Sequence, residues 1–553
     1  MSLLAQIRRS VIGEGLPIST PFGQKPLVYA DYTASGRGLT FIEAFIQHRV
    51  LPGYANTHTE TSFTGRQSTA LREQARQQIR SAVNGTAQHK VIFAGSGATA
   101  AIDKLIGMLN LRLPPQLDGQ HGFDQQIEDS QRPVVFIGPY EHHSNELIWR
   151  ESITTLVSIP LDNQGQIDQC QLALELQRYA DRPLKIGSFS AASNVTGIKS
   201  DVRTISELLH RHGALAFWDY AAAAPYVAID LQAQGQDALF ISPHKFIGGP
   251  GTPGVLVVNE QILTNTIPAV PGGGTVVYVT PEDHCYSTDI ERREEGGTPA
   301  IVESIRAGLV FQLQQQVGTA QIEALEHGFM QRALHRWEQH SAIEVLGGTE
   351  AERLSICSFQ IHHQGKPLHY GFVVALLNDL FGIQARGGCS CAGPYGHHLL
   401  GLTMADSKAL EARLLAGDSV LRPGWTRLNF NYFIDEASFD YLVRAVELVA
   451  EYGWCLLPFY QFDTAAGVWR YQGQQVELPV ALTDCHPEQV ITVENGLPVD
   501  FAALLQQAED ELCRSRRGES RYALGLNHQS AALCWFILPE QIELDDEGEP
   551  GRQ

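Results

Sequence analysis

Three features are scarce in this sequence, and each scarcity excludes a class of protein. Nowhere do about 18 apolar residues run together, which argues against a membrane-spanning helix. Nine cysteines in 553 residues are too few for a disulfide scaffold, so a reducing cytoplasm fits best. Basic residues are outnumbered, with 40 Lys and Arg against 61 Asp and Glu, which gives a formal net charge of −21. Because such a surface repels phosphate backbones, we expect no nucleic-acid partner. The lack of a long apolar run leads us to expect no membrane partner either.

The pattern of apolar residues predicts an α/β protein with more than one core. The chain is 44% apolar and long enough to bury two or three cores. From about residue 80 to 258, short apolar runs alternate with amphipathic stretches, which is typical of a mostly parallel sheet covered by helices. Later the pattern becomes that of a second, smaller α+β domain. It predicts helices at 301–317, 322–341 and 371–380 and a strand at 355–362.

We expect four parts along the chain. They are an N-terminal segment (1–45) that contributes to the small domain, a large domain (46–300), a small C-terminal α+β domain (301–452) and an extra module (453–553). Aromatic residues cluster in the extra module, but its sequence indicates no role. Within the large domain, the polar stretch 113–132 is predicted to be a surface loop between a helix and a strand.

The functional signal lies in the residues directly after each predicted strand, because ligands of open α/β sheets bind at the carboxyl ends of the strands. The turn 95–99 (Gly-Ser-Gly-Ala-Thr) opens a helix and offers free N–H groups to a phosphate. The turn 141–145 (Glu-His-His-Ser-Asn) holds an imidazole that could stack on a flat ring, and 193–197 (Ser-Asn-Val-Thr-Gly) holds an amide donor. Taken singly, each is more often a plain turn or a solvated loop.

Two charged residues at strand ends are harder to explain as surface residues. Asp219 ends an apolar run, and a buried carboxylate needs a cation or a strong donor as its partner. A protonated pyridine nitrogen is such a partner. Lys245 comes after another apolar strand and precedes the glycine-rich segment 248–254, where desolvation would lower its pKa and make it a usable Schiff-base amine. The sequence therefore predicts an enzyme that carries pyridoxal 5′-phosphate (PLP) on Lys245.

Together these motifs resemble the class V aminotransferase fold, closest to its cysteine desulfurase and selenocysteine lyase branch, over roughly residues 28–449. The resemblance implies the type I fold of PLP-dependent transferases, with a seven-stranded, mostly parallel sheet, and a homodimer. It implies that Lys245 holds PLP as a Schiff base, that Asp219 pairs with the pyridinium nitrogen, and that His142 stacks on the ring. The remaining cofactor contacts that it implies are Asn194 at the phenolic oxygen, Gly97, Ala98, Thr99, Ser242 and His244 at the phosphate, and Thr298 at the phosphate of the other subunit.

The same resemblance assigns the substrate site. Arg427 matches the arginine that clamps the substrate carboxylate, a task suited to a planar two-pronged donor, and Arg386, His58 and Asn194 are the other implied substrate contacts. The segment 386–394 (Arg-Gly-Gly-Cys-Ser-Cys-Ala-Gly-Pro) is similar to the family's Arg-x-Gly-x-x-Cys-Ala-x-Pro segment. Counting from its arginine puts Cys391 at the nucleophile's position, where a thiolate would take sulfur from L-cysteine as a persulfide and release alanine. A sulfur-acceptor protein is then a candidate partner.

Apart from the resemblance, Cys389 and Cys391 could be ordinary buried cysteines, although a glycine-rich loop is a poor place to bury a side chain. Their C-x-C spacing alone is weak evidence for a metal site, and we expect no metal. Two positions depart from the family: Ala222 stands where desulfurases carry a glutamine, and Cys389 stands where close relatives more often carry a histidine.

These departures keep three hypotheses open. The first is a cysteine desulfurase or selenocysteine lyase. The second is another PLP reaction on the same fold, such as transamination, epimerisation or C–S lysis on a different amino acid. The third is a non-catalytic protein that keeps a PLP pocket, which is disfavoured because every residue needed to bind and activate the cofactor is present.

Overall fold

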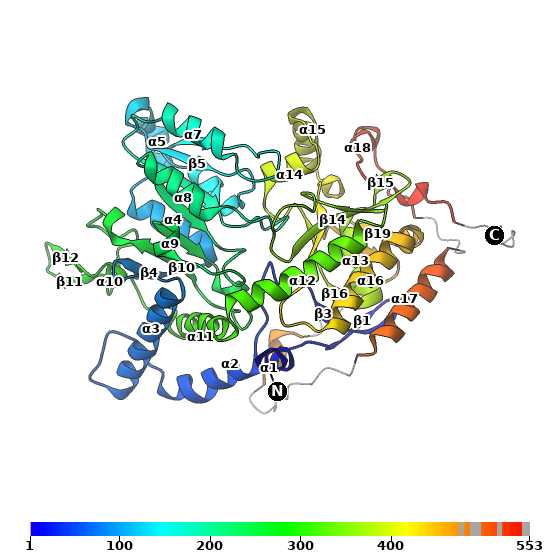
Figure 1. Cartoon of the computed structure of the whole chain (residues 1–553), viewed down its shortest axis with the longest axis horizontal. Coiled ribbons are helices and arrows are strands. Elements are labelled where there is room, and N and C mark those ends of the chain that lie inside the picture. Colours follow the sequence, from blue (N-terminus) through cyan, green and yellow to red (C-terminus); the bar gives the residue numbers. More distant parts are fainter. Residues whose placement is uncertain (1, 475–479, 487–498, 517–521, 545–553) are drawn as a thin grey trace.

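The computed structural model of the protein describes residues 2–474, 480–486, 499–516 and 522–544, and Figure 1 shows its two main sheets side by side. The larger sheet has seven strands in the order β4-β10-β9-β8-β7-β5-β6. Neighbours from β6 to β9 run parallel, whereas β10 runs antiparallel to both β9 and β4, so the predicted mostly parallel sheet is confirmed. The strands are β4 (His89–Ala94), β5 (Val134–Ile137), β6 (Thr155–Ser158), β7 (Lys185–Ser190), β8 (Leu215–Asp219), β9 (Ala238–Ile241) and β10 (Gly254–Asn259).

The large sheet is buried on both faces, which explains why its strands are continuous apolar runs. In β5, Val134 and Phe136 join one hydrophobic cluster while Val135 and Ile137 join another, because successive side chains point to opposite faces. The first cluster includes residues of α8 (Val202–Arg211) and α11 (Ile301–Val317), and the second includes residues of α4 (Gly97–Met108). The other main helices of this part are α3 (Phe63–Ala82), which packs against α11, and α7 (Gln169–Arg178).

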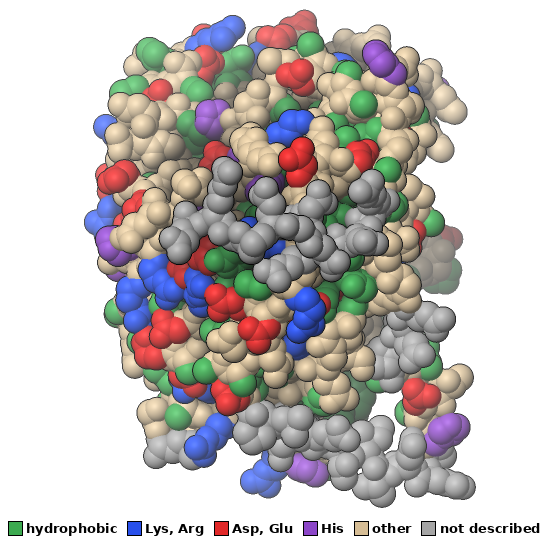
Figure 2. All heavy atoms as spheres, turned by 90° about the vertical axis from the view of Figure 1, so that its right-hand side faces the viewer, with side chains coloured by type: hydrophobic (Ala, Val, Ile, Leu, Met, Phe, Trp, Pro, Cys, Tyr) green, Lys and Arg blue, Asp and Glu red, His purple; other side chains and the backbone are tan. Residues whose placement is uncertain are grey.

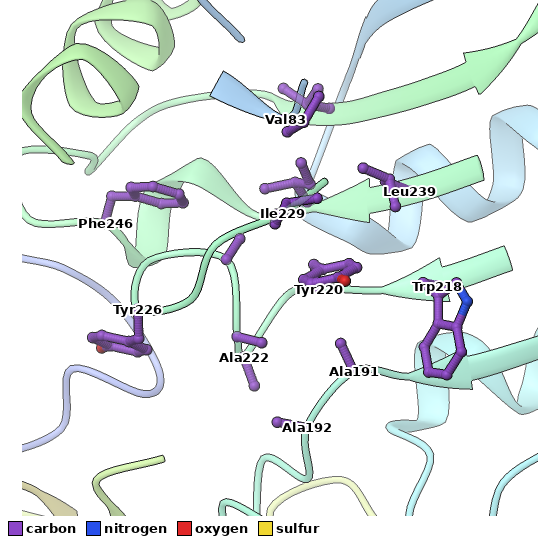
Figure 3. Close-up of a cluster of buried hydrophobic side chains, with 14 of the residues drawn as sticks. Val83, Ala191, Ala192, Trp218, Tyr220, Ala222, Tyr226, Ile229, Leu239 and Phe246 are labelled. Carbon is purple, nitrogen blue, oxygen red and sulfur yellow. The ribbon is translucent and has the colours of Figure 1, made fainter. Parts of the chain in front are cut away.

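The loops that leave the carboxyl ends of these strands are themselves packed. Figure 3 shows Ala191 and Ala192 after β7 and Tyr220 and Ala222 after β8, all within a buried cluster. Residues placed on these loops therefore stand on rigid supports.

The expectation of a plain surface loop at residues 113–132 was wrong. This stretch contains the helix α5 (Pro115–His121) and two short 3₁₀ turns, η3 (Asp124–Gln126) and η4 (Asp129–Gln131). Pro115 occupies the first turn of α5 and Gly122 ends it in the left-handed conformation at φ 63°. Proline and glycine mark helix boundaries as well as loops, so the same two residues fit both structures.

The smaller sheet is antiparallel and lies beside the first. Its strands β13 (Ile343–Val345), β14 (Ile356–His363), β18 (Trp425–Asn429) and β17 (Arg386–Gly388) are arranged in that order, with β15 (Lys366–Pro367) paired to β14. The N-terminal segment joins this part, because β3 (Val28–Tyr29) pairs in parallel with β16 (Ile383–Gln384). The main helices around this sheet are α12 (Thr319–Trp337), α13 (Tyr370–Phe381), α14 (Gly393–Leu399), α15 (Met404–Leu415) and α16 (Glu436–Tyr452).

The described residues after Tyr452 share the core of the smaller sheet instead of forming a core of their own. His369, the N-cap of α13, accepts a hydrogen bond at Nδ1 from Trp469 Nε1 (3.0 Å), and its ring lies 4.9 Å from that of Phe536. On the face seen in Figure 2, acidic and basic side chains are interspersed. The elements of this region are η9 (Gly453–Phe459), β19 (Tyr460–Asp463), β20 (Val468–Tyr471), η10 (Leu482–Asp484), α17 (Phe501–Ser515), α18 (His528–Ala532) and η11 (Pro539–Gln541).

The remaining elements are short and flank or connect the strands and helices described above. Among the residues described, no helix combines the length and the apolar character needed to cross a membrane. The remaining helices and strands are α1 (Leu3–Ser10), β1 (Pro17–Thr20), β2 (Gly23–Pro26), α2 (Thr40–Phe45), η1 (Ile46–Val50), η2 (Leu51–Gly53), η5 (His143–Asn145), α6 (Leu147–Arg150), α9 (Leu231–Gln234), η6 (Pro243–Lys245), η7 (Glu260–Ile262), β11 (Val276–Val279), β12 (His284–Tyr286), α10 (Ile290–Glu294) and η8 (Ser419–Leu421).

Candidate active site

A cavity of about 280 Å³ lies where the carboxyl ends of the large sheet meet the N-terminal segment and the edge strand β17. Twelve of the fourteen residues proposed from the sequence line it. They are Gly97, Ala98, Thr99, His142, Asn194, Asp219, Ser242, His244, Lys245, Arg386, Cys391 and Arg427.

One end of the cavity is built to hold an anion. The helix α4 begins there at Gly97, and the Ala98 N–H donates to Ser242 Oγ (2.9 Å). Thr99 Oγ1 lies 2.6 Å from Ser144 Oγ, so hydroxyl groups line the same wall. Gly97 has φ 58°, and a Cβ there would lie 2.8 Å from His244 Cε1, which explains the glycine. A helix N-terminus with clustered hydroxyls is a ready phosphate site.

The middle of the cavity sets a buried carboxylate near a buried amine. Asp219 ends β8, and its Oδ1 accepts the N–H of Ala221 (2.8 Å). Burial raises the pKa of Asp219, while the Ala221 hydrogen bond and the Lys245 charge lower it. Burial lowers the pKa of Lys245 to about 8, against the opposing attraction of Asp219. The amine of Lys245 is therefore partly neutral near physiological pH.

The histidines of the cavity are kept neutral. Burial, together with the charge of Lys245, lowers the pKa of His142 to about 4 and that of His244 to about 4. His142 Nδ1 accepts the N–H of Ser144 (3.1 Å), so the proton of the neutral ring is on Nε2. A neutral imidazole can stack on a heteroaromatic ring without adding charge beside it.

Two arginines of the cavity wall share one carboxylate, Asp31. Asp31 Oδ2 accepts from Arg386 Nε (2.8 Å) and its Oδ1 from Arg427 Nη2 (3.1 Å). Arg427 also donates from Nη1 to Asn194 O (2.8 Å), and within the described part of the chain its buried Nε has no hydrogen-bond partner. Asp31 therefore fixes the orientation of both guanidinium groups, which are donors of the kind that suits a carboxylate.

Cys391 reaches the cavity from a strained turn, which we call the cysteine loop (389–393). Ser390 and Cys391 both have positive φ, at 53° and 55°, and the Ala392 N–H donates to Cys389 O (3.2 Å) to close the turn. Asn194 Nδ2 donates to Ser390 O (2.7 Å), which ties the loop to the end of β7. Cys389 and Cys391 are free thiols, and the exposed Cys391 is the one that lines the cavity.

Two predicted residues, His58 and Thr298, do not line this cavity. Thr298 Oγ1 accepts from Asn56 Nδ2 (3.3 Å), so the segments that carry His58 and Thr298 meet each other instead. A Cβ added at Gly274 would lie 3.6 Å from His58 Nε2, which places the hairpin formed by β11 and β12 in the same neighbourhood.

The sequence interpretation missed one charged residue of the cavity region and several small ones. Asp31 comes after the strand β3 much as Asp219 ends β8, so the same pattern of a carboxylate after an apolar run could have identified it. Ala222 lies in the cavity wall, which puts its departure from the family pattern at the site itself. The other lining residues not predicted are Thr33, Ala34, Ser96, Ser144, Ser190, Ala192, Ala221 and Ser390.

The residues present fit PLP. The N-terminus of α4 with Ser242 and Thr99 suits a phosphate, Lys245 suits an aldehyde, and Asp219 suits a pyridinium nitrogen. Asn194 Oδ1 is buried with no hydrogen-bond partner among the described residues, whereas its Nδ2, the donor that a phenolic oxygen would need, donates to Ser390 O.

Comparisons with known proteins agree with this fit. The family model described as "Aminotransferase class-V" matches residues 28–405. A probable cysteine desulfurase of Halalkalibacterium halodurans is 30% identical over 374 residues, which are 67% of this chain and 85% of that protein. A cysteine desulfurase of Synechococcus elongatus is 28% identical over 380 residues, which are 67% of this chain and 55% of that protein.

Solved structures show the same fold. A cysteine desulfurase of Thermococcus onnurineus, solved in its apo form, superposes with a TM-score of 0.63 at 20% identity, covering 77% of this chain and 95% of that one. A cysteine desulfurase of Escherichia coli gives a TM-score of 0.60 at 20% identity, covering 76% and 94%.

Proposed function

Because the chain belongs to the class-V aminotransferase family of PLP-dependent enzymes, we propose that it is a cysteine desulfurase of the selenocysteine lyase-like branch. In this proposal L-cysteine gives its sulfur to Cys391 as a persulfide and leaves as alanine. The observation that carries the proposal is the exposed thiol of Cys391 in the wall of the cavity that holds Lys245 and Asp219. The related proteins named as cysteine desulfurases support the same activity.

The residues of the cavity divide the work. When bound, PLP supplies an electron sink for the substrate's bonds. Lys245 provides the amine that holds the cofactor aldehyde, and Asp219 keeps a proton on the ring nitrogen. Arg427 and Arg386, oriented by Asp31, bind the substrate carboxylate. The Cys391 thiolate would bond to the substrate sulfur as the substrate's Cβ–S bond breaks. The electron pair of that bond stays on Cβ, which takes up a proton to give alanine, and the sulfur remains on Cys391 as a persulfide.

The test is incubation of the purified protein with L-cysteine and a thiol reductant, followed by measurement of alanine and sulfide. Equal amounts of both products are expected. A second candidate is another class V reaction, namely transamination, epimerisation or C–S lysis, and it is favoured by Ala222 in the cavity wall. That candidate would be supported if alanine were replaced by pyruvate from C–S lysis, by the keto acid of the substrate from transamination, or by a racemised substrate from epimerisation.

Asp219→Asn is expected to lower alanine formation roughly a hundredfold, since losing a margin of about 3 kcal/mol in the transition state has that effect. A neutral amide cannot hold the pyridinium proton as a carboxylate does. The fold should persist, because the amide oxygen can still accept the Ala221 N–H. Steady-state kinetics and far-UV circular dichroism measure the two outcomes, and wild-type turnover in this variant would make Asp219 purely structural.

The rate at which the apoprotein binds PLP covalently is expected to rise with pH through about 8 and to level off above it. Only the neutral amine is nucleophilic, and burial lowers the pKa of Lys245 from 10.5 to about 8. Most of the amine is therefore already neutral a little above pH 8, and a further rise in pH adds little to the rate. Borohydride trapping at fixed times after mixing measures the rate. A free lysine derivative is the control, and a rate that keeps rising toward pH 10 would contradict a lowered pKa.

We propose further that the enzyme is a homodimer. His58 and Thr298 lie away from their own cavity, as expected of residues that complete the site of a second subunit. Large apolar side chains are exposed close to His58 in the chain and on the hairpin of β11 and β12, with Phe63 64% and Tyr278 70% exposed. A second copy would cover them.

A cytoplasmic location and a sulfur-acceptor protein complete the proposal. Persulfide chemistry needs Cys391 as a free thiol, which a reducing compartment maintains. Because the Cys391 side chain is exposed, an acceptor thiol can reach the sulfur that it carries.

A further inference from the structure

The second histidine of the motif 141–145 has no part in the cavity. The ring of His142 lines the cavity, whereas His143 does not, and their ring centroids lie 6.2 Å apart with the planes tilted by 48°. Both residues come after β5, and His143 begins the short turn η5. The motif therefore sends one ring toward the cofactor site and the other in a different direction.

His143 contacts the cysteine loop at two points. Its main-chain N–H donates to Cys391 O (2.8 Å), and its side-chain Nε2 accepts the N–H of Gly393 (3.0 Å). These two hydrogen bonds bracket Ala392, the residue next to the nucleophile. With the bond from Asn194 to Ser390 O, the loop is fastened to the ends of β5 and β7 at three backbone positions.

The side-chain bond has a strict chemical requirement. Because the Gly393 N–H is a donor, His143 Nε2 must carry a lone pair, so the neutral ring has its proton on Nδ1. The contact is also close, since a Cβ at Gly393 would lie 3.2 Å from Nε2. The loop it holds contains two consecutive residues at positive φ, a conformation that persists only where its surroundings impose it.

We propose that His143 is a positioning residue that fastens the cysteine loop so that the Cys391 thiol faces the cavity. The inference deepens the proposed desulfurase function and rests on it for its effect on turnover. The hydrogen-bond geometry itself is independent of which reaction occurs. His143 acts through the loop backbone, whereas Lys245, Asp219 and Cys391 act on the cofactor or the substrate.

His143→Ala in the PLP-loaded protein removes the side-chain bond to Gly393. It leaves the bond from the His143 main-chain N–H to Cys391 O and the bond from Asn194 Nδ2 to Ser390 O. PLP content and visible absorption should match the wild type, because His143 does not line the cavity. The Gly393 amide should exchange its hydrogen faster, and iodoacetamide should alkylate Cys391 several-fold faster. The kcat for alanine should fall about tenfold with little change in KM, since one hydrogen bond is lost and the arginine clamp is untouched.

A matched pair of variants tests the acceptor itself. His143→Gln places an amide oxygen near the position of Nε2 and should restore the kcat and the slow Gly393 exchange to within about twofold of the wild type. His143→Asn places its oxygen near the position of Nδ1, too short to reach Gly393, and should behave like His143→Ala. The two amides differ by one methylene, so the comparison isolates the reach of the acceptor.

Three outcomes would overturn the inference. They are wild-type exchange and alkylation in His143→Ala, equal behaviour of the Gln and Asn variants, and loss of PLP from His143→Ala, which would assign the residue to the cofactor wall. If the wild-type protein makes no alanine from L-cysteine, the proposed function fails by that result alone. Gly393 exchange and Cys391 alkylation would then still decide whether His143 holds the loop.

Discussion

Lys245→Ala is expected to abolish the covalent bond between protein and cofactor and to lower turnover by about three orders of magnitude or more. Lys245 is the one lysine among the described residues that lines the cavity, and its burial is what makes its amine reactive near neutral pH. No neighbouring amine of the described cavity wall can replace it. The purified wild type should be yellow, with an absorption band that borohydride abolishes, and the variant should lack any reducible bond to the cofactor.

Lys408→Ala is a suitable control because Lys408 lies on an exposed helix surface, with 73% of its side chain accessible, and pairs only with Glu411 among described residues. It should keep the absorption band and full turnover. Mass spectrometry after borohydride reduction should find the cofactor on the peptide that contains Lys245. A Lys245→Ala protein with a reducible lysine imine would remove the central assignment.

The parts of the site at the ends of strands could be predicted because their signal is local. Asp219 and Lys245 each lie at or just after the end of an apolar run, and the sheet brings the ends of β8 and β9 together by adjacent pairing. Register alone places Asp219 beside Phe240, two residues before Ser242. No knowledge of distant segments is needed for that inference.

The parts that depend on distant segments could not be predicted in the same way. Asp31 meets Arg427 across 396 positions, and His143 meets Gly393 across 250. The first contact exists because the N-terminal segment packs beside β18, and the second because the smaller sheet lies against the larger one. Similarly, β6 was not anticipated, because an edge strand with half-exposed side chains lacks a continuous apolar signature.

The four-part division of the chain stays a prediction, although the course of the C-terminal module bears on it. Clustered aromatics after residue 452 predict a separate unit. In the structure aromatics of that cluster, including Phe462 and Trp469, lie in one core with α13 and α16. Aromatic clustering indicates that the side chains are buried, but not which segments they pack against. It therefore could not distinguish an independent module from an extension of an existing core.

Cys391→Ala is expected to bind PLP normally and to make almost no alanine from L-cysteine. Only the desulfurase function needs a thiolate at this position, whereas transamination and epimerisation need the cofactor and a carboxylate clamp. Lys245, Asp219 and Arg427 keep their contacts in the variant, because the hydrogen bonds that hold Asp219 and Arg427 run to Ala221, Asn194 and Asp31. Visible absorption, substrate-induced spectral change and alanine yield measure binding and turnover separately.

Cys389→Ala is the matched control, since it removes the other thiol of the same loop. Cys389 does not line the cavity, so its loss should be milder than that of Cys391, although it could slow the passage of sulfur to an acceptor. Both substitutions keep the turn closed by the Ala392 N–H and Cys389 O, because that bond joins main-chain atoms. A difference between the two variants therefore reports the thiols and not the loop.

The location of the sulfur decides between the two candidate functions. After brief exposure of the wild type to L-cysteine, mass spectrometry should find one added sulfur on the peptide containing Cys391. Cleavage between Cys389 and Cys391, or the same measurement on Cys389→Ala, shows which of the two cysteines carries it. The added sulfur should be absent from Cys391→Ala. Unimpaired alanine formation by Cys391→Ala, with no persulfide on the wild-type peptide, would rule out the desulfurase function. The residues that hold the cofactor and the carboxylate would then serve another class V reaction, for which Ala222 in the cavity wall is the first position to examine.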